Sequence, residues 1–589
     1  MQKRWVLREA DEKVIVLLSE KLGVSPLIAR LLCNRGYGQP ELAGPFLSSS
    51  LRSDLPSPFL MAGMEAATAR LVDALKRKDL ICVWGDYDVD GTTGAAALVS
   101  FLKEIGGEPI YYVPHRIEEG YGLNGDGLGR LGDRGVRLVV SVDCGISNSR
   151  EVEIARQLGI DVVVVGHHEP PEELPRACAI LNPHRRDCSF PDKGLSGAGL
   201  AFYLIIGLRA KLREAGWFNE GAIPDIRRYL DIVTLGTIAD MVPLRGVNRV
   251  LARRGLAELS DSRRPGVAAL KQVAGIPAGE VGVGPVAFQL GPRINAAGRM
   301  DAGLKVVDML TTASYDAALR IAQELDGHNR ARQAMEAVVL EEALSRINGN
   351  PVYRDRYSFV LGNDGWHPGV LGIVASRIVE RFHRPTVVIG FHGGEGKGSA
   401  RSVRGFHMVE GLRGCADILE KFGGHEYAGG LSIKKEKFEL FAERFEEIAR
   451  ESLKPDDLIP LLEVDAELDF SLTGLPLVRA LAQLEPFGIG NPEPLFMTRG
   501  VDVLERRDFN GGARLRFRRA GRGIGAVAFD RQLRVSSNEL RGEGPSKPDT
   551  LDSILAPGTR IDVVYRLSEN EWSGTVAVEL RIVDARPSK

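Results

Sequence analysis

Apolar runs alternate with amphipathic segments over residues 71–275. The strand-like runs are Leu80–Trp84, Pro109–Val113, Val136–Val142, Asp161–Val165 and Ala179–Leu181. Segments with helical spacing, such as Arg150–Leu158, lie between them. Continuous apolar strands separated by helices are typical of a parallel sheet that helices cover on both faces. The pattern therefore predicts a multidomain α/β protein whose first large domain has a mainly parallel sheet.

The pattern changes on either side of this region. Residues 1–70 predict a small helical lead-in, with helices over Asp11–Leu22 and Pro26–Asn34. Residues 276–345 are helical and charged, and predict a connector with one long helix over Asp316–Ile347. The α/β pattern returns over 346–455, with strands expected at Tyr357–Leu361, Thr386–Gly390 and Gly398–Val403. Residues 456–589 have alternating runs, such as Ala513–Phe517 and Gly574–Val583, that predict a small antiparallel β-barrel.

Composition adds limits to this picture. A chain of 589 residues is too long for one core and predicts about three to four domains. The net charge of −2 gives no overall attraction to nucleic acid, so any such binding must come from local basic patches. Six scattered cysteines without a CxxC pair indicate free thiols in a reducing compartment. No apolar run reaches about 18 residues and the N-terminus is charged, so we expect a cytoplasmic protein with no membrane association.

Carboxylates gather where the first predicted strand ends. Asp86, Asp88 and Asp90 follow Leu80–Trp84 at every second position. Crowded carboxylates raise one another's pKa, and proteins tolerate such a group mainly where a divalent cation lies among them. The sequence therefore predicts a metal site at this end of the strand.

Later strand and helix ends add candidates of the same chemistry. Asp143 follows Val136–Val142, the pair His167-His168 follows Asp161–Val165, and Asp240 follows an apolar helix. Because neighbouring parallel strands end at one edge of a sheet, we expect these side chains to meet there. The predicted metal ligands are Asp88, Asp90, Asp143, His167 and Asp240, with Asp86 adjacent. Carboxylates with imidazole suit Mn²⁺ or Mg²⁺, and a shared carboxylate could bridge two ions about 3.5–4 Å apart.

Each of these features has a simpler interpretation when taken alone. An Asp at a strand–helix junction is often a helix N-cap, and a His pair after a strand is often packed or on the surface. Asp240 could merely end its helix. Four such features at consecutive element ends favour the metal site.

The same segments resemble a known superfamily. GDYDVDG, VSVDCG, GHHEP and TIADMVPL look like the four motifs of the DHH phosphoesterases. Five later segments narrow the resemblance to the RecJ family of bacterial single-strand-specific exonucleases, over about residues 50–585: GPRINAAGR, GWHPGVLG, GSARS, FGGHEYAGG and PFGIGNPEP.

This resemblance implies a metal-dependent 5′→3′ exonuclease that hydrolyses single-stranded DNA to mononucleotides in DNA repair and recombination, with two Mn²⁺ or Mg²⁺ ions. It implies a DHH domain over 71–275, a connecting helix, a DHH-associated domain over 346–455 and an OB fold over 456–589. Single-stranded DNA is the implied partner. A single-strand binding protein and a helicase stay open as protein partners, and we expect a monomer.

The resemblance also assigns roles to residues. It implies that Asp86, Asp88, Asp90, Asp143, His167 and Asp240 bind metal and that His168 faces the substrate phosphate. The positions that match phosphate-binding residues of the family are Arg116, Arg299, Ser399 and Arg401.

The predicted barrel has a basic strand face that suggests nucleic-acid binding. Arg514, Arg516 and Arg518 alternate with Leu515 and Phe517, so the arginines share one face of a strand. A basic OB face commonly tracks single-stranded nucleic acid, whereas the alternative is an edge strand protected by charge. Candidate stacking residues are Phe496, Phe509 and Phe517, each of which could instead belong to the core.

One position departs from the superfamily pattern. The motif is Asp-His-His, but this chain has Gly166-His167-His168. Loss of a carboxylate beside a metal centre can cost about 10–100-fold in affinity or activity. This departure keeps open one alternative, a catalytically weakened DNA-binding scaffold. A separate alternative is a DHH phosphodiesterase acting on short oligonucleotides or cyclic dinucleotides, against which the length of the chain and the predicted barrel argue.

Overall fold

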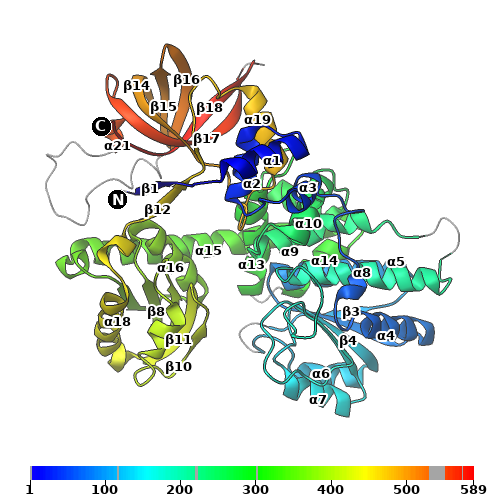
Figure 1. The fold of residues 1–589 in the computed structure, drawn as a ribbon. Coiled ribbons are helices and arrows are strands. Elements are labelled where there is room, and N and C mark those ends of the chain that lie inside the picture. Colours follow the sequence, from blue (N-terminus) through cyan, green and yellow to red (C-terminus); the bar gives the residue numbers. More distant parts are fainter. Residues whose placement is uncertain are drawn as a thin grey trace. The chain divides into compact units, whose positions relative to one another are not determined.

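The computed structural model describes residues 3–115, 119–218, 223–299, 303–529, 551–572 and 575–588 (Figure 1). The chain divides into two compact units. The parallel-sheet unit comprises Gln39–Arg330 and Gln483–Pro492, and the barrel unit comprises Met1–Gly38, Ala331–Ala482 and Glu493–Lys589.

The parallel-sheet unit is built on five strands in the order β3-β2-β4-β5-β6, all parallel to their neighbours. They are β2 Leu80–Gly85, β3 Ile110–Tyr112, β4 Val136–Val142, β5 Asp161–Val165 and β6 Ala179–Leu181, which confirms the predicted strands. The register pairs Gly85 with Val142, Val142 with Val165 and Val165 with Leu181. Four strands therefore end in line at one edge of the sheet.

Helices cover both faces of this sheet (Figure 1). On one face, α4 (Met64–Arg77), α5 (Val89–Glu104) and α8 (Gly197–Glu214) form the main core. On the other, α6 (Gly125–Asp133) and α7 (Ser149–Gln157) pack over a smaller cluster. Small and apolar residues on all sides of α5 explain its near-complete burial, because a helix without a polar face must lie inside the fold.

A second layer of helices packs outside α5. Helix α9 (Leu230–Ala239) contacts α5, α8 and α10 (Gly246–Ser260). The other short elements of this unit are α3 Pro40–Ser48, η1 Pro58–Leu60, η2 Ile226–Tyr229, α11 Pro265–Val273, α12 Val283–Pro285, η3 Val286–Leu290, α13 Gly291–Arg299 and α14 Gly303–Thr311. The long helix predicted from the sequence is α15, Tyr315–Gly349, and the boundary between the two units falls within it.

A second α/β sheet lies in the barrel unit. Its order is β10-β11-β9-β8-β7, with β7 parallel to β8 and the other neighbours antiparallel. The strands are β7 Phe359–Asp364, β8 Thr386–His392, β9 Glu395–Arg401, β10 Lys421–Gly424 and β11 Ala428–Lys434. The helices and turns of this part are η4 Pro351–Arg354, α16 Pro368–Phe382, α17 Met408–Arg413, η5 Lys435–Lys437 and α18 Phe438–Ser452. The predicted end of β9 at Val403 was wrong, because the chain leaves the sheet after Arg401.

The C-terminal sheet closes into the predicted barrel, but it is not wholly antiparallel: Gly525–Val527 pair in parallel with Glu579–Arg581, and Ala466–Glu467 with Phe496–Met497. Its order is β13-β14-β15-β16-β18-β17, and β14 also pairs with β17. The strands are β13 Ala466–Glu467, β14 Phe496–Phe509, β15 Gly512–Arg519, β16 Arg522–Phe529, β17 Arg560–Trp572 and β18 Thr575–Pro587. Short helical segments accompany them: η6 Pro455–Leu458, α19 Leu475–Leu481, η7 Ala482–Leu484 and α21 Leu551–Ile554.

The N-terminal segment contains the predicted helices and one strand that the sequence pattern did not predict. Helices α1 (Glu12–Leu22) and α2 (Pro26–Asn34) follow β1 (Arg4–Leu7), which pairs in parallel with β12 (Leu461–Val464). No local pattern could indicate a partner more than 450 residues away in the chain. Among the described residues, no helix is both long and apolar enough to cross a membrane.

Candidate metal centre

The first acidic turn lies between β2 and α5. Asp88 caps α5, because its Oδ1 accepts a hydrogen bond of 3.0 Å from the Gly91 N–H. Asp90 is 1% exposed, and its carboxylate accepts from the N–H groups of Gly197 and Ala198 at the start of α8. The simple N-cap interpretation is thus correct for Asp88, yet the turn still brings its carboxylate beside buried acidic neighbours.

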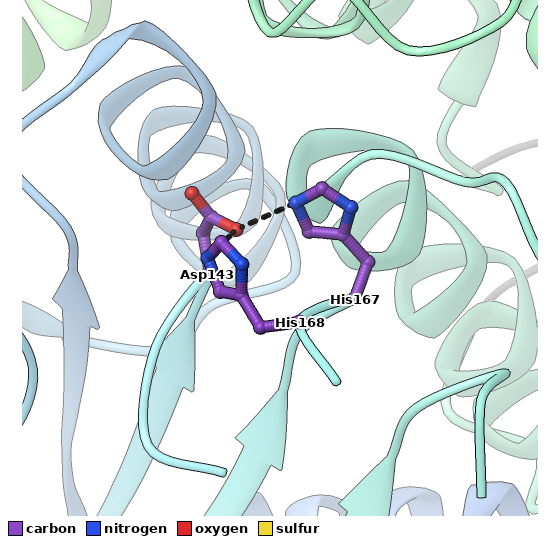
Figure 2. Close-up of side chains that lie close together, drawn as sticks. All are labelled: Asp143, His167 and His168. Carbon is purple, nitrogen blue, oxygen red and sulfur yellow. Dashed lines mark ion pairs between the residues drawn. The ribbon is translucent and has the colours of Figure 1, made fainter. Parts of the chain in front are cut away.

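Asp143 and the histidine pair face one another at the ends of β4 and β5 (Figure 2). His167 Nε2 lies 3.2 Å from Asp143 Oδ1, and His168 Nε2 lies 3.4 Å from the same oxygen. Asp143 has a φ of +63°, a left-handed conformation that costs free energy in a residue with a side chain. Such strain at a buried carboxylate is typical of a functional site.

Asp240 completes the arrangement from the end of α9. Its Oδ2 lies 3.4 Å from His167 Nε2, and Asp90 Oδ2 lies 3.9 Å from the same nitrogen. Three groups of ligand atoms, each within 4.8 Å of one another, could hold a metal ion: Asp86 with Asp88 and Asp143, Asp90 with His167 and Asp240, and Asp143 with His167 and His168. Asp143 and His167 each belong to two groups, so the donor set suits two adjacent ions.

The chemistry of these atoms fits a cation. Asp143 Oδ1, His167 Nε2 and Asp240 Oδ2 are buried and make no hydrogen bond within the described part of the chain. Burial is the main cause that raises the pKa of Asp90 to about 6 and the pKa of Asp240 to about 9. Neighbouring carboxylates raise both pKa values further, whereas His167 lowers both. Burial is also the main cause that raises the pKa of Asp143, and three neighbouring carboxylates raise it further. A divalent cation would remove this penalty on negative charge.

Three polar side chains, none of them predicted as a site residue, hold the backbone around the predicted ligands. The Tyr121 hydroxyl donates to the Asp143 carbonyl at 2.8 Å, and the Asn182 amide donates to the His168 carbonyl at 2.8 Å. Asn295 Oδ1 accepts from the Val89 N–H at 3.2 Å. Asn182 directly follows the strand Ala179–Leu181, so the strand-end criterion could have found it, whereas no sequence signal pointed to Tyr121.

Close backbone approach explains one glycine of the centre. A Cβ on Gly197 would lie 2.6 Å from the Asp143 Cβ, so no side chain fits there. Gly166 differs, because its Cβ would make only ordinary contacts of 3.7–3.8 Å with Asp143 and Cys144. The position that departs from the superfamily motif therefore has room for a side chain.

The remaining predicted substrate-binding residues are not among the residues that form the candidate metal centre. Ser399 and Arg401 sit on β9, where the Arg401 guanidinium donates to Ser399 Oγ at 3.2 Å, and burial lowers the pKa of Arg401. A Cβ on Gly372 of α16 would lie 2.9 Å from Arg401 Nη2, so this helix packs closely on the pair. Arg116 lies outside the described residues; Arg299 ends α13, and its side chain lies outside them.

Arg514 and Arg516 are exposed on β15 of the barrel. This strand pairs with β14 and β16, so the alternative of a charged edge strand is wrong. Phe496 and Phe517 are fully buried and belong to the core, whereas Phe509 is 41% exposed. Phe509 meets Phe529, which is 39% exposed, edge to face with ring centroids 6.4 Å apart.

Comparisons with known proteins agree with this architecture. The family models that match are the DHH family N-terminal domain over residues 80–237, the DHHA1 domain over 356–451 and the RecJ OB domain over 464–584. The single-stranded-DNA-specific exonuclease RecJ of Escherichia coli is 38% identical over 579 residues, which cover 95% of this chain and 96% of that protein. The chain belongs to the RecJ family.

Other RecJ proteins support the same assignment. RecJ of Bacillus subtilis is 35% identical over 588 residues, which cover all of this chain and 71% of that protein. The crystal structure of Thermus thermophilus RecJ in complex with Mn²⁺ matches with a TM-score of 0.81 and 31% identity, covering all of this chain and 80% of that one. A structure of the same protein in complex with Mg²⁺ matches with a TM-score of 0.76.

The raised pKa of Asp240 predicts how stability depends on pH. Because the folded protein binds this proton more tightly than the unfolded chain, the contribution to stability is present at low pH and is lost as pH rises toward about 9. We expect the protein in EDTA to lose more thermal stability between about pH 5 and pH 9 than an Asp240→Asn variant. Thermal unfolding of both proteins at several pH values measures this difference.

Added Mn²⁺ provides the complementary test. It should raise the Tm of the unmodified protein most at high pH, where the carboxylates have lost their protons, and should raise that of Asp240→Asn less. Equal pH profiles for the two proteins would contradict the electrostatic account of this centre.

Proposed function

We propose that the protein is a metal-dependent 5′→3′ exonuclease that hydrolyses single-stranded DNA to mononucleotides in DNA repair and recombination. The observation that carries this proposal is the convergence of three metal-competent donor groups at the ends of β2, β4 and β5 and of α9, in a chain that belongs to the RecJ family. The Thermus thermophilus RecJ structures are complexes with Mn²⁺ and with Mg²⁺, and both ions suit this set of carboxylates and imidazoles.

The ligands divide between two sites. In this proposal Asp86, Asp88 and Asp143 would hold one ion, and Asp90, His167 and Asp240 would hold the other. The two groups adjoin where His167 Nε2 lies 3.2 Å from Asp143 Oδ1. When bound, such ions supply Lewis acidity for phosphoester hydrolysis. His168 has a side chain that is 45% exposed, which leaves its imidazole accessible to a substrate phosphate.

Arginines hold the substrate in this proposal. Arg401 and Ser399 form a polar pair beside α16, where a partly buried guanidinium can bind phosphate oxygens at two points. Arg116 and Arg299 are proposed phosphate contacts on the strength of their motifs alone. Proposed protein partners are a single-strand binding protein and a helicase. A monomeric state, a cytoplasmic location and the domain limits at residues 70, 275, 345 and 455 stay predictions.

The outer face of β14, β15 and β16 is the proposed path for the rest of the DNA strand. Arg514, Arg516 and Arg518 run along the central strand of this face, and Arg516 lies opposite Gly525 of β16, which adds no side chain. The pair Phe509–Phe529 stands at one end, on either side of Gly512 in the register. Arginines for phosphates and exposed rings for bases are the elements of a single-strand binding face.

Removing the two rings should weaken DNA binding. Stacking contributes about 1–3 kcal/mol per base, so we expect Phe509→Ala with Phe529→Ala to weaken binding of a long oligothymidylate by about tenfold or more. In this variant the dependence of DNA affinity on salt concentration should stay unchanged. Arg514→Ala with Arg516→Ala should instead make DNA affinity fall less steeply with rising salt concentration, because two phosphate contacts are lost. Fluorescence anisotropy at several salt concentrations measures both effects.

A surface leucine in the same unit provides the control. Leu440→Ala removes a side chain that is 59% exposed on α18, and should leave DNA affinity unchanged. Unaltered binding by the phenylalanine variant would place the DNA away from this end of the face.

Digestion of end-labelled DNA tests the main proposal. We expect the full-length protein with Mn²⁺ to release a 5′ label as mononucleotide before it shortens the 3′ end. EDTA or Asp143→Ala should abolish the reaction, because both remove the proposed metal centre. Binding without cleavage would favour the scaffold alternative, and activity limited to the shortest oligonucleotides in a length series would favour the small-substrate phosphodiesterase.

Gly166 provides a second test of catalysis. Its backbone φ is not in the left-handed region and the site has room for a Cβ, so an Asp should fit without strain. We expect Gly166→Asp to raise the rate of Mn²⁺-dependent hydrolysis by about tenfold, the lower end of the effect of supporting groups at metal sites. Gly166→Asn is the isosteric control that lacks the charge. No gain from Asp would indicate that glycine is harmless here.

A further inference from the structure

A ten-residue segment of the chain joins the parallel-sheet unit from far along the sequence. Gln483–Pro492 belongs to that unit, whereas the residues on both sides of it belong to the barrel unit. The segment contains Pro486-Phe487-Gly488-Ile489-Gly490-Asn491-Pro492, a motif to which the proposed catalysis assigns no role. We call Gln483–Pro492 the clip.

Buried polar groups determine the shape of the clip. Arg249 of α10 is 1% exposed, and its guanidinium donates to the carbonyls of Leu484 at 2.8 Å and Gln483 at 3.1 Å. Asn491 is fully buried, and its amide donates to the carbonyls of Leu484 and Pro486, both at 2.8 Å. Buried polar groups are retained where their hydrogen bonds are satisfied, so this is a built attachment and not an incidental contact.

The clip holds the turn that follows the predicted ligand Asp240. The Leu244 N–H donates to the Ile489 carbonyl at 2.7 Å, and Arg245 Nε donates to the Gly490 carbonyl. Gly490 has a φ of +74°, and a Cβ there would lie 3.0 Å from the Pro243 Cβ. A side chain at Gly490 would therefore press on Pro243 and Arg245, which would have to shift by a few tenths of an ångström.

The turn contains one strained residue. Met241, directly after Asp240, has a φ of +61° and is 66% exposed, so packing of its side chain contributes little to holding this strained conformation. Within the described residues, the turn is also held by Asn248, whose amide donates to the Pro243 carbonyl at 3.1 Å. The clip supplies a second attachment on the far side of the strained residue from Asp240.

We propose that the clip is a positioning element of the metal centre, which keeps the Asp240 carboxylate in place by fixing the turn over Met241–Arg245. The inference rests on the metal-binding role proposed for Asp240. Because the chain runs from the clip into β14, the metal site depends on the segment that leads into the barrel. Groups that orient ligands from outside the metal's own coordination typically change affinity by about 10–100-fold.

Direct Mn²⁺ binding by full-length variants tests this inference. Gly490→Ala strains the clip against Pro243, and Arg245→Ala removes one of its hydrogen bonds. We expect each to raise the Kd for Mn²⁺ by about tenfold, measured by electron paramagnetic resonance of the free ion. Arg245→Lys retains a donor and should recover most of the affinity. Saturating Mn²⁺ should restore hydrolysis in all three variants.

Matched controls separate positioning from general loss of stability. Gly275 has a φ of +68° with nothing within 4 Å of its Cβ position, so Gly275→Ala introduces similar backbone strain away from the clip. Arg254 lies on the same helix as Arg249 and donates to the Ser49 carbonyl at 3.2 Å, so Arg254→Ala removes a comparable bond. Both controls should bind Mn²⁺ like the unmodified protein, even where the Tm in EDTA falls.

Unchanged Mn²⁺ affinity in Gly490→Ala and Arg245→Ala, or an equal loss in the two controls, would overturn the inference. Failure of the proposed function looks different, because the unmodified protein would then bind Mn²⁺ without digesting single-stranded DNA. The binding titration still decides the role of the clip in that case.

Discussion

The crowding of negative charge at one sheet edge is the constraint on which the site depends. Asp90 and Asp143 are each 1% exposed, and Asp240 lies with them around the imidazole of His167. Burial and mutual repulsion raise the pKa of all three carboxyl groups. A fold does not keep such an arrangement for stability, because neutral side chains would cost less. Divalent cations make the arrangement favourable, and they connect the architecture to phosphoester chemistry.

The rest of the parallel-sheet unit positions the side chains at that edge of the sheet. The in-line register of β2, β4, β5 and β6 brings four strand ends together, and α9 adds Asp240 from a different layer. Two residues at or beside predicted ligands, Asp143 and Met241, have left-handed backbones. The Tyr121 hydroxyl bonds the Asp143 carbonyl, and the clip bonds Leu244 and Arg245 in the turn that contains Met241. Residues outside the predicted donor set thus contact both strained segments of the chain.

Sequence patterns predicted the elements well where the signal is local. The five strands of the parallel sheet, α2 and the long helix α15 lie where apolar runs and helical periodicity indicated. These patterns did not predict strand pairing where the partner strand is distant in the sequence. The pairing of β1 with β12 had no local signal, and β15 could not be recognised as a central strand because its neighbours are set by barrel closure. Likewise, Phe509 could be separated from Phe496 and Phe517 only by burial.

The sequence by itself determined the chemistry of the centre. Carboxylates and histidines at consecutive strand and helix ends are local features, since each depends on a short run of residues and on the rule that parallel strands end together. Only the tertiary structure decided how the donors divide into groups, that Gly166 has room for a side chain, and that Gln483–Pro492 holds the turn after Asp240. These properties depend on distances between segments far apart in the chain, and packing sets those distances.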